Sequence, residues 1–384
     1  MTKPMPLDEF TRLPPALGVE RVDGLAGAID SVAARAAPSH RFLRYGWYAA
    51  ALRAYGGAAR TVSVVREGIA VAAMPVVATG PAALGLVSVP GCYWPFRSFP
   101  VAEDAGVEVA DALLGALARG ARALRIGPVY DGDPGLELLK AAARARGWAV
   151  LDRFVADSYL LDMAALRVEG IWPRNSTLRK NRFHEKHLAA HGALDWGFVE
   201  GAGWDDAAFD ALAAVEERSW IAARTDGSDA KFTATGHGAF WRAAAEDPVI
   251  AGMLWAAVLR VDGVPTAFSF DLNTGALKYA IANSYDPAVG KHSPGKLLYY
   301  RNLIRAIEDG ISTVDWGAGD GGYKQVIGAA RGPAIRDWLF VRPGPSAFAA
   351  KMLRSIWMRS GHRQAAPGTE PVPQAMSPSE DRDL

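Results

Sequence analysis

Residues 254–283 constrain the fold of this 384-residue chain most strongly, because they read as three consecutive β-strands. Apolar and β-branched side chains dominate three runs, at residues 254–260, 265–272 and 276–283. The pairs Asp262-Gly263 and Thr274-Gly275 lie between these runs, and such pairs favour tight hairpin turns. The sequence therefore predicts a three-strand antiparallel meander.

Helices and strands alternate on both sides of this meander, which indicates an α/β or α+β architecture. Before it we expect a hairpin in 59–78, helices at 107–119, 134–146, 175–191, 207–218 and 238–246, and strands at 123–126 and 159–163. After it we expect a helix at 293–309 ended by Gly310, strands at 313–316 and 337–341, and between them a short helix at Tyr323. The length exceeds what one hydrophobic core usually supports. We therefore predict lobes at 1–155 and 156–345, then a basic helix and a disordered tail at 346–384.

The charge and cysteine content narrow the class of protein. The 42 basic and 41 acidic side chains nearly cancel, so the overall charge gives no reason to expect a DNA partner. Cys92 is the only cysteine, which excludes an internal disulfide and a thiolate metal site. No secretory signal pattern and no long apolar run occurs. We expect a cytoplasmic protein without a metal, and leave open a peripheral position at the inner face of the membrane.

Two segments carry a family resemblance: GVPTAFSFDLNTGALKYAIANSYD at 263–286, and KHSPGKLLYYRNLIRAIEDGISTVDWGAGDGGYKQVIGA at 291–329. They resemble the BioF2-like and CelD-like acetyltransferases of cellulose and exopolysaccharide biosynthesis. That family is a branch of the GNAT superfamily related to the FemABX peptidyltransferases. The resemblance spans about residues 174–329. It implies tandem GNAT-like lobes, each a mixed and largely antiparallel sheet flanked by helices. It also implies acyl transfer from acyl-CoA to an amine.

A site for the phosphates of acyl-CoA is expected at the start of the 293–309 helix. Ser293 can cap the helix, Pro294 suits its first turn, and free backbone N–H groups attract anions. We therefore assign His292, Ser293, Gly295 and Lys296 to carrier binding. An ordinary capped helix with solvated lysines is the alternative.

Three side chains of the meander are candidates for proton transfer. Tyr285 lies just past the last strand, where its phenol could protonate a departing thiolate. Tyr279 is a second candidate acid, although aromatic residues in strands usually serve packing. Asp271 is expected at the end of the middle strand, as a base for the amine or as a carboxylate that solvates the turn.

A strand end, a glycine-rich turn and a helix start are expected to bring Asp315, Asp320 and Lys324 together. The resemblance to FemABX proteins implies that Lys324 contacts the substrate or the oxyanion. We assign Asp315, Asp320 and Tyr323 to substrate binding. A structural pair between an aspartate and the lysine is the alternative.

Further candidates lie outside this cluster. The helix at 175–191 is basic, and we assign Arg179 and Arg182 to a phosphorylated or nucleotide-linked acceptor, with a solvated face as the alternative. Trp94 and Arg97 suit contact with a sugar or nucleotide, with core packing as the alternative. A second basic run interleaved with apolar residues spans 346–363. It can contact an anionic membrane surface, although we favour packing on the domain.

Two motif matches are rejected. Gly317, Gly319 and Gly322 fit G-x-G-x-x-G, but the helix that follows is too short and no βαβ unit surrounds them. His184 and His187 are three residues apart, so they do not form H-E-x-x-H.

The sequence thus predicts an N-acyltransferase that uses acyl-CoA, most plausibly acetyl-CoA, and acts on an amino sugar or a surface-polysaccharide precursor. A FemABX-type transferase that uses aminoacyl-tRNA is a second hypothesis, against which the near-neutral charge argues. A non-catalytic effector that binds a nucleotide in polysaccharide output is a third. The acceptor and the oligomeric state are not determined by the sequence.

Overall fold

The computed structural model describes residues 16–92, 94–169, 172–219, 227, 230–319, 322–352 and 354–364. Its strands form one twelve-stranded sheet in the order β1-β2-β3-β4-β5-β12-β6-β11-β10-β9-β8-β7. The first half of the chain supplies β1 (Leu17–Asp23), β2 (Ala59–Arg66), β3 (Ile69–Ala78), β4 (Leu86–Ser88), β5 (Ala123–Tyr130) and β6 (Ala149–Asp162). The second half supplies β7 (Leu194–Glu200), β8 (Leu254–Val261), β9 (Val264–Thr274), β10 (Leu277–Tyr285), β11 (Thr313–Ala318) and β12 (Ala330–Val341).

The two halves of the chain repeat one topology. In the first half β1 to β4 are antiparallel neighbours and β4 then pairs in parallel with β5. In the second half β7 to β10 are antiparallel neighbours and β10 pairs in parallel with β11. This repeat confirms the mixed, largely antiparallel α/β architecture that the sequence predicts.

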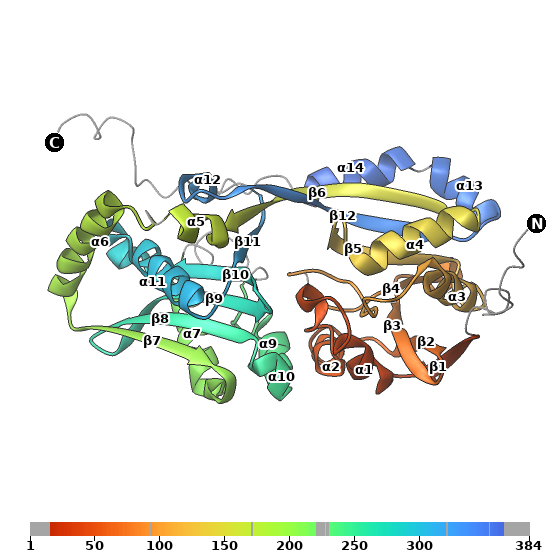
Figure 1. Ribbon diagram of the computed structural model, residues 1–384, viewed down its shortest axis with the longest axis horizontal. Helices are drawn as coiled ribbons and strands as arrows, with labels where there is room; N and C mark the ends of the chain where they lie inside the picture. Colours follow the sequence, from red (N-terminus) through yellow and green to blue (C-terminus); the bar gives the residue numbers. More distant parts are fainter. Residues whose placement is uncertain are drawn as a thin grey trace, which may run out of the picture.

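The last strand of each half crosses to the other half (Figure 1). β6 pairs with β11 of the second half, and β12 pairs with β5 of the first half, while β6 and β12 pair with each other along most of their length. Both strands are much longer than the segments expected from the sequence, because each has hydrogen-bonding partners on two sides. The expected boundary after residue 155 falls inside β6.

Helices cover both faces of the sheet. The first half contributes α1 (Ala28–Ala33), η2 (Pro38–His40), α2 (Tyr45–Tyr55), α3 (Val107–Leu117) and α4 (Pro134–Ala145). The second half contributes α5 (Met163–Glu169), α6 (Asn175–Leu188), α7 (Asp206–Arg218), α9 (Gly238–Ala245), α10 (Pro248–Ala251), η6 (Pro287–His292), α11 (Pro294–Glu308) and α12 (Tyr323–Val326). The last described elements are α13 (Pro345–Met352) and α14 (Arg354–Gln364).

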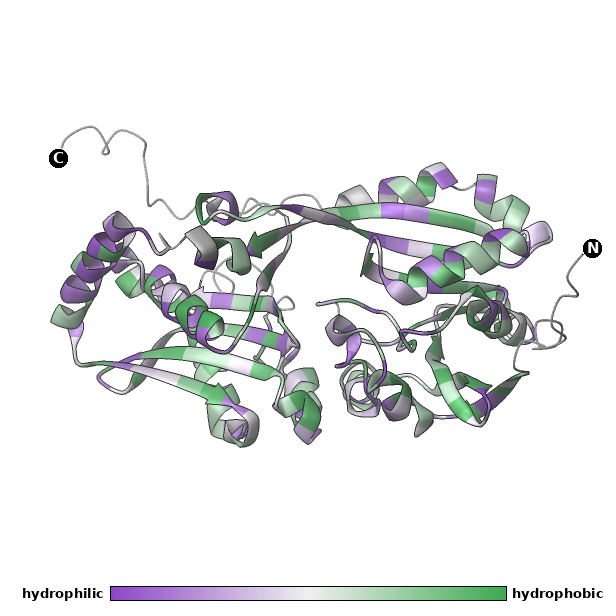
Figure 2. Ribbon diagram, in the orientation of Figure 1, coloured by the Kyte–Doolittle hydropathy of each residue, from purple (hydrophilic) through white to green (hydrophobic). Residues whose placement is uncertain are grey.

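Local signals account for several helix starts and for the meander. The carboxylates of Asp133 and Asp205 accept backbone N–H groups at the starts of α4 and α7. The predicted meander is confirmed as β8, β9 and β10, with positive φ at Asp262, Gly263 and Gly275 in its turns. The hydropathy view separates α6, which is hydrophilic over most of its length, from the apolar strands beneath it (Figure 2).

One hydrophobic core runs through both halves. Trp47 of α2 contacts Phe240 and Trp241 of α9, with ring centroids 4.7 and 5.8 Å apart. Phe96 of the first half contacts Tyr279 of β10, with centroids 5.9 Å apart. The halves therefore share buried aromatic contacts as well as a sheet. Among the described residues, no helix is long and apolar enough to cross a membrane.

Candidate functional site

The parallel strands β10 and β11 pair over a short distance and then part. Their register joins Leu277 to Thr313, Lys278 to Val314 and Tyr279 to Asp315, and no further pair is formed between them. β10 continues to Tyr285 and carries a bulge just after Ala280. Bulges often lie beside active sites, where they end pairing and redirect side chains. Backbone groups beyond this point are available to an extended ligand.

The start of α11 packs against the free end of β10. A Cβ added to Gly295 would lie 2.9 Å from the Asn283 Oδ1 atom and 3.0 Å from the Tyr285 ring. Gly290 of η6 approaches the same ring, since its Cβ would lie 3.3 Å away. The structure thus brings Tyr285 together with the residues assigned to the carrier.

The expected cap by Ser293 is wrong in detail. Ser293 stands at the N-cap position, but its φ is 51° and its side chain makes no capping hydrogen bond. A left-handed conformation at a residue with a Cβ is strained, and such strain gathers at functional sites. The amide of Ser293 instead donates to the Gly290 carbonyl, 2.9 Å away, which closes η6. The capping role is therefore left to a ligand or to water.

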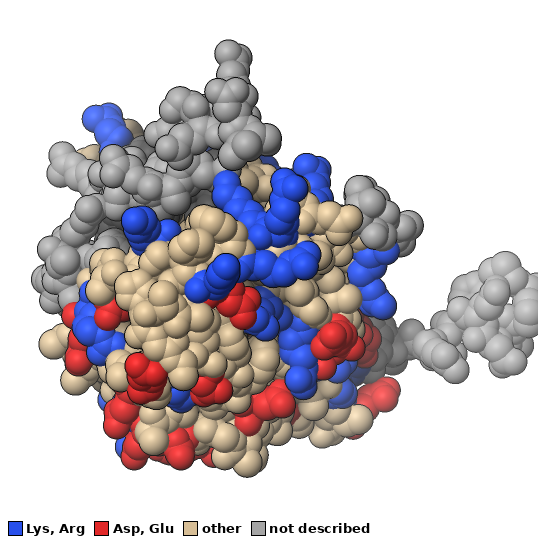
Figure 3. All heavy atoms as spheres, turned by 90° about the vertical axis from the view of Figure 1, so that its left-hand side faces the viewer, with Lys and Arg blue, Asp and Glu red and all other residues tan. Residues whose placement is uncertain are grey.

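Positive charge accumulates beside this helix start (Figure 3). Arg179, Lys180, Arg182 and Lys186 are exposed on α6. Glu185, the acid of that helix, pairs with Arg301 of α11 at 2.6 Å, and no carboxylate of the described residues pairs with the four cations. The surface made by these four cations with Lys291, His292 and Lys296 is called the α6 surface below.

Burial and neighbouring positive charges lower the pKa of several basic groups on and beside the α6 surface. Burial, and then the charge of Lys180, lower the pKa of Lys296. Burial, and then Lys296 and Lys180, lower the pKa of His184. His292 has a lowered pKa from burial first and then from His191, whose Nε2 lies 3.0 Å from its own Nε2. An anion bound here would relieve this repulsion.

At the point where β10 and β11 part, Asp315 is buried, with 3% of the residue exposed. Burial is the largest cause that raises the pKa of Asp315 to about 6, while the Tyr130 phenol, the Gly317 N–H and Lys324 act in the opposite direction. The Gly317 N–H donates to the Asp315 Oδ1 atom at 2.7 Å. A carboxyl group with such a pKa can accept and release a proton near neutral pH.

Two residues of the first half complete this environment. The hydroxyl of Tyr130, from β5, is buried near Asp315. Burial, and then the charge of Asp315, raise the pKa of this phenol well above its usual value. Trp94 contacts Tyr130 at 5.7 Å between centroids, and its ring closes against Gly317. Sequence reasoning selected Trp94 but missed Tyr130, which offers no local signal because its partner lies in another strand far along the chain.

Lys324 lies in the predicted cluster, near enough to Asp315 to act on its pKa. It is buried, and its Nζ atom donates to the carbonyls of Ala318 and Gly319 at 3.0 and 2.7 Å. The ammonium thus holds the turn that follows β11, and its contact with the substrate or the oxyanion stays a prediction. Asp320 lies outside the described residues, as does the side chain of Tyr323.

Two candidates of the meander are part of the packing. Asp271 lies inside β9 rather than at its end, and its carboxylate contacts the Lys278 Nζ at 3.1 Å and the Asn302 Nδ2 at 2.6 Å. The carboxylate is buried among these partners and does not lie beside a turn. Tyr279 is buried and donates to the Ser39 carbonyl at 3.3 Å, so the packing alternative holds for it.

Arg97 lies near Arg125 and Asp337. Burial lowers its pKa, with Arg125 adding to the effect, and the nearby charges include Asp337. Asp337 in turn pairs with Arg125 at 2.9 Å and with Arg153 at 2.5 Å. The structure therefore places Arg97 beside a buried charge cluster of the central strands, and Arg179 and Arg182 on the α6 surface.

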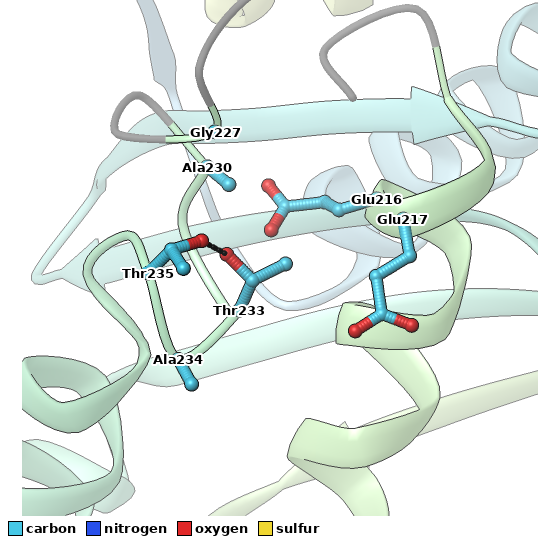
Figure 4. A pocket seen from close by; sticks show the side chains of 7 residues that line it. All are labelled: Glu216, Glu217, Gly227, Ala230, Thr233, Ala234 and Thr235. Atoms are coloured by element: carbon cyan, nitrogen blue, oxygen red, sulfur yellow. Dashed lines mark hydrogen bonds between the residues drawn. The ribbon is translucent and has the colours of Figure 1, made fainter. Parts of the chain in front are cut away.

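A cavity of about 230 Å³ lies beside the end of α7 (Figure 4). The Glu216 carboxylate and the hydroxyls of Thr233 and Thr235 point toward this space. Glu216 also accepts the N–H groups of Lys231 and Phe232 at 2.9 and 2.7 Å, and burial raises its pKa. A second cavity is lined by Ala37, Val101, Ala102, Glu103, Ala105, Pro134, Glu137 and Leu138. Neither is lined by a residue that the sequence analysis selected.

One protein-family model matches most of the second half. Residues 175–325 match the family model described as an acetyltransferase (GNAT) domain. This segment is therefore similar to the acetyltransferase domains of the GNAT fold. The match includes α6, the meander, α11 and β11, which are the elements of the site, and it supports an N-acyltransferase. No curated protein matches the chain significantly.

Solved structures share the fold over nearly the whole chain. FemX is 12% identical with a TM-score of 0.58, and the alignment covers 87% of this chain and 100% of FemX. The C-terminal domain of a protein from Agrobacterium fabrum named as a lysylphosphatidylglycerol synthetase is 16% identical with a TM-score of 0.50, covering 87% and 96%. A protein of unknown function from Bacteroides thetaiotaomicron is 13% identical with a TM-score of 0.51, covering 84% and 99%. At these identities the likeness shows the fold.

The contact between Trp94 and Gly317 can be tested by substitution. Gly317 has a φ of 70°, and an added Cβ would lie 2.8 Å from the Trp94 ring. We expect Gly317→Ala to lower the free energy of unfolding by about 2–3 kcal/mol in urea titrations, from backbone strain and steric overlap together. Gly319→Ala is the control, because its φ is 74° but no atom lies within 4 Å of the added Cβ. Equal losses for the two variants would show that the Trp94 contact adds nothing.

Proposed function

We propose that the protein transfers an acyl group, in the first place acetyl, from acyl-CoA to the amine of an amino sugar or another precursor of a surface polysaccharide or cell-envelope polymer. One observation carries the proposal. Within the GNAT domain, β10 and β11 part directly after Tyr279 and Asp315, with the α6 surface beside the α11 start and a titratable carboxyl at the point of parting. The choice of an amino sugar or polysaccharide precursor as acceptor rests on the resemblance of the sequence to BioF2-like and CelD-like enzymes.

The carrier binds at the start of α11 in this proposal. Backbone N–H groups of the first turn and the side chain of Lys296 meet its phosphates. The open edge of β10 accepts the extended arm of the carrier through backbone hydrogen bonds. The lowered pKa of Lys296 is consistent with a site that lacks its anion.

The acceptor amine binds toward Asp315. An ammonium group is attracted by the carboxylate and by the faces of Trp94 and Tyr130. Asp315 takes one proton from the ammonium, and the neutral amine then attacks the thioester carbonyl carbon. The C–N bond forms, the C–S bond breaks, and the second proton of the amine nitrogen passes to the departing thiolate. Tyr285 lies six residues beyond Tyr279 on β10, roughly 20 Å along the strand, so in this proposal it contacts the carrier near the start of α11. No other reactant is required.

The proposal is tested by titrating acetyl-CoA into the protein in a calorimeter. We expect micromolar binding for the wild type and at least about tenfold weaker binding for Lys291→Ala/Lys296→Ala, because each charged contact to a phosphate contributes roughly 1.5–3 kcal/mol. Lys140→Ala is the control, since Lys140 lies on α4 and pairs with Glu137. The CoA-dependent function is excluded if millimolar acetyl-CoA gives no heat of binding.

The α6 surface also supports a second candidate, a transferase that takes its acyl group from aminoacyl-tRNA. Four exposed cations without carboxylate partners, together with Lys291 and Lys296, exceed what the phosphates of one CoA molecule require. Binding of charged tRNA that falls steeply with salt, together with no binding of acetyl-CoA, would favour this donor. The hypothesis of a non-catalytic effector predicts nucleotide binding without turnover of either donor.

A further inference from the structure

The last two helices expose an unusual amount of apolar side chain. Phe348 and Met352 of α13 are each 69% exposed, and Ile356 of α14 is 63% exposed. Phe348 and Met352 are four residues apart in one helix, so they share a face. Met358 adds a fourth exposed apolar side chain within eleven residues. Single exposed apolar residues are common on proteins, but a group of this kind marks an interaction surface.

This segment is purely basic in charge. Residues 343–364 contain no aspartate and no glutamate, and they contain Lys351, Arg354, Arg359 and Arg363. Lys351, Arg354 and Arg359 are exposed, and none of them forms an ion pair with a carboxylate of the described residues. Most arginines elsewhere in the described structure do have such partners, for example Arg66, Arg146 and Arg242. The charge of the segment is therefore free to meet an external anion.

The segment is attached to the sheet by its other side. The Arg153 guanidinium of β6 lies 4.3 Å from the centre of the Trp357 ring. Ala347 is buried in a small cluster with Ala149 of β6 and Val341 of β12. Figure 1 shows α13 and α14 lying along the outer side of β6. Packing on the domain, which the sequence analysis favoured, thus uses Ala347 and Trp357 and leaves Phe348, Met352 and Ile356 outside.

We propose that α13 and α14 form a docking surface for a bilayer leaflet rich in anionic phospholipid. An amphipathic basic helix lies in the plane of the membrane interface, with its apolar side chains at the acyl boundary and its cations at the phosphates. Phe348, Met352 and Ile356 supply the apolar contact, and Lys351, Arg354 and Arg359 supply the charge. A bilayer fits this surface better than an acidic protein, because the exposed apolar side chains need an apolar phase as well as an anionic one.

The α6 surface differs from α13 and α14 in how much apolar side chain it exposes, and this difference separates binding of a soluble anion from binding of a membrane. It carries as many cations, but Phe183 is the large apolar side chain that α6 exposes among its described residues. Charge without apolar area suits a soluble anion, whereas charge with apolar area suits a membrane interface. The membrane inference stands independently of the proposed acyl transfer, since it concerns α13 and α14, which lie toward the other end of the molecule from α6 (Figure 1).

Co-sedimentation of the full chain with lipid vesicles tests the inference. We expect binding to vesicles of phosphatidylcholine and phosphatidylglycerol in equal parts and little binding to phosphatidylcholine alone. Lys351→Gln/Arg354→Gln/Arg359→Gln should weaken binding between tenfold and about 100-fold, from the contribution of each cation near an anionic surface. Phe348→Ser/Met352→Ser/Ile356→Ser should weaken it at least about tenfold. These side chains are exposed, so both variants should keep the melting temperature and the acetyl-CoA affinity of the wild type.

A matched control uses the other basic surface. Arg179→Gln/Lys180→Gln/Arg182→Gln removes the same charge from α6 and should leave vesicle binding unchanged. The inference is overturned if no vesicle binding occurs, if only the α6 variant loses it, or if both variants of the last helices retain it. It is also overturned if sedimentation velocity shows that the apolar substitutions turn a dimer into a monomer without affecting vesicle binding, because a second copy would then cover this surface.

Discussion

Asp315→Asn is expected to lower kcat/KM about 10²- to 10⁴-fold and to remove a rise in activity centred near pH 6, because general-base catalysis contributes factors of this size. The pKa of Asp315 is raised to about 6, so the wild-type carboxyl gains its proton-accepting form as the pH passes through this value. Asparagine keeps an acceptor for the Gly317 N–H but cannot take a proton. The measurement is kcat/KM against pH for both proteins, with acetyl-CoA and an amino-sugar acceptor.

Stability measurements separate this role from a structural one. In the folded protein the pKa of Asp315 lies above its ordinary value of 3.8, so the folded state binds more protons than the unfolded state between about pH 4 and 6. The free energy of unfolding of the wild type should therefore fall as the pH rises through this window, by about 3 kcal/mol. Asp315→Asn should lack this loss and be the more stable protein at pH 7, although it is the less active one.

Asp309→Asn serves as the control, since Asp309 is a more exposed carboxylate paired with Arg305 at 3.2 Å. It should change neither the pH profile nor the stability by more than about 1 kcal/mol. A value of kcat/KM for Asp315→Asn within threefold of the wild type would remove Asp315 from the mechanism. An unchanged pH profile would assign the titration to another group.

Lys278→Met is expected to lower the free energy of unfolding by about 3–5 kcal/mol, because it leaves the Asp271 carboxylate buried without its cation. Both side chains of this pair are 1% exposed, and the Lys278 Nζ lies 3.1 Å from the Asp271 Oδ2 atom. Burial is the largest cause that lowers the pKa of Lys278, and Asp271 opposes it. Asn302 donates to the same carboxylate, but a neutral amide cannot replace the lost charge. Urea titration measures the loss.

Removing both partners should restore much of the stability, since an apolar pair avoids the cost of burying charge. Asp271→Leu/Lys278→Met is therefore expected to be more stable than Lys278→Met alone. Arg53→Ala is the control, because the Arg53 and Glu246 side chains are each 66% exposed and their pair should contribute less than about 1 kcal/mol. A double variant as unstable as the single one would show that packing, rather than charge, causes the loss.

Signals that act within one element or one turn were sufficient for the meander and for several helices. The Asp-Gly and Thr-Gly turns, the stripe of Leu297, Tyr300 and Leu303, and the Ser-Pro-Gly start of α11 are local patterns, and the structure contains the elements they predict. The same locality explains why Gly295 and Lys296 were placed at one helix start, whereas the contact of Gly295 with Tyr285 was not predicted. Ser293 was placed correctly at the helix start, but its left-handed backbone came from closing η6.

The candidate site was less accessible to sequence reasoning where its partners come from distant strands. Asp315 was recognised as a polar residue of a strand, but its raised pKa depends on burial in the assembled fold and on Tyr130. The sequence suggested that Asp271 is a carboxylate beside a turn. In the structure β9 continues to Thr274, and Asn302 of α11 contacts the Asp271 carboxylate. The sequence placed Lys324 near Asp315, but it gave no sign that the Lys324 ammonium contacts carbonyls of the turn after β11.

The sequence by itself determined the alternation of helices and strands, the meander and the basic character of α6 and of the last helices, because these depend on composition and short-range periodicity. The likeness of the second half to GNAT acetyltransferases rested on a resemblance of its motifs. The tertiary structure alone decided the exchange of β6 and β12 between the halves, the shared core, the environment of Asp315 and the exposure of Phe348, Met352 and Ile356. These features depend on which surfaces meet, and strand pairing and burial between residues far apart in the chain leave no periodic signal in either segment.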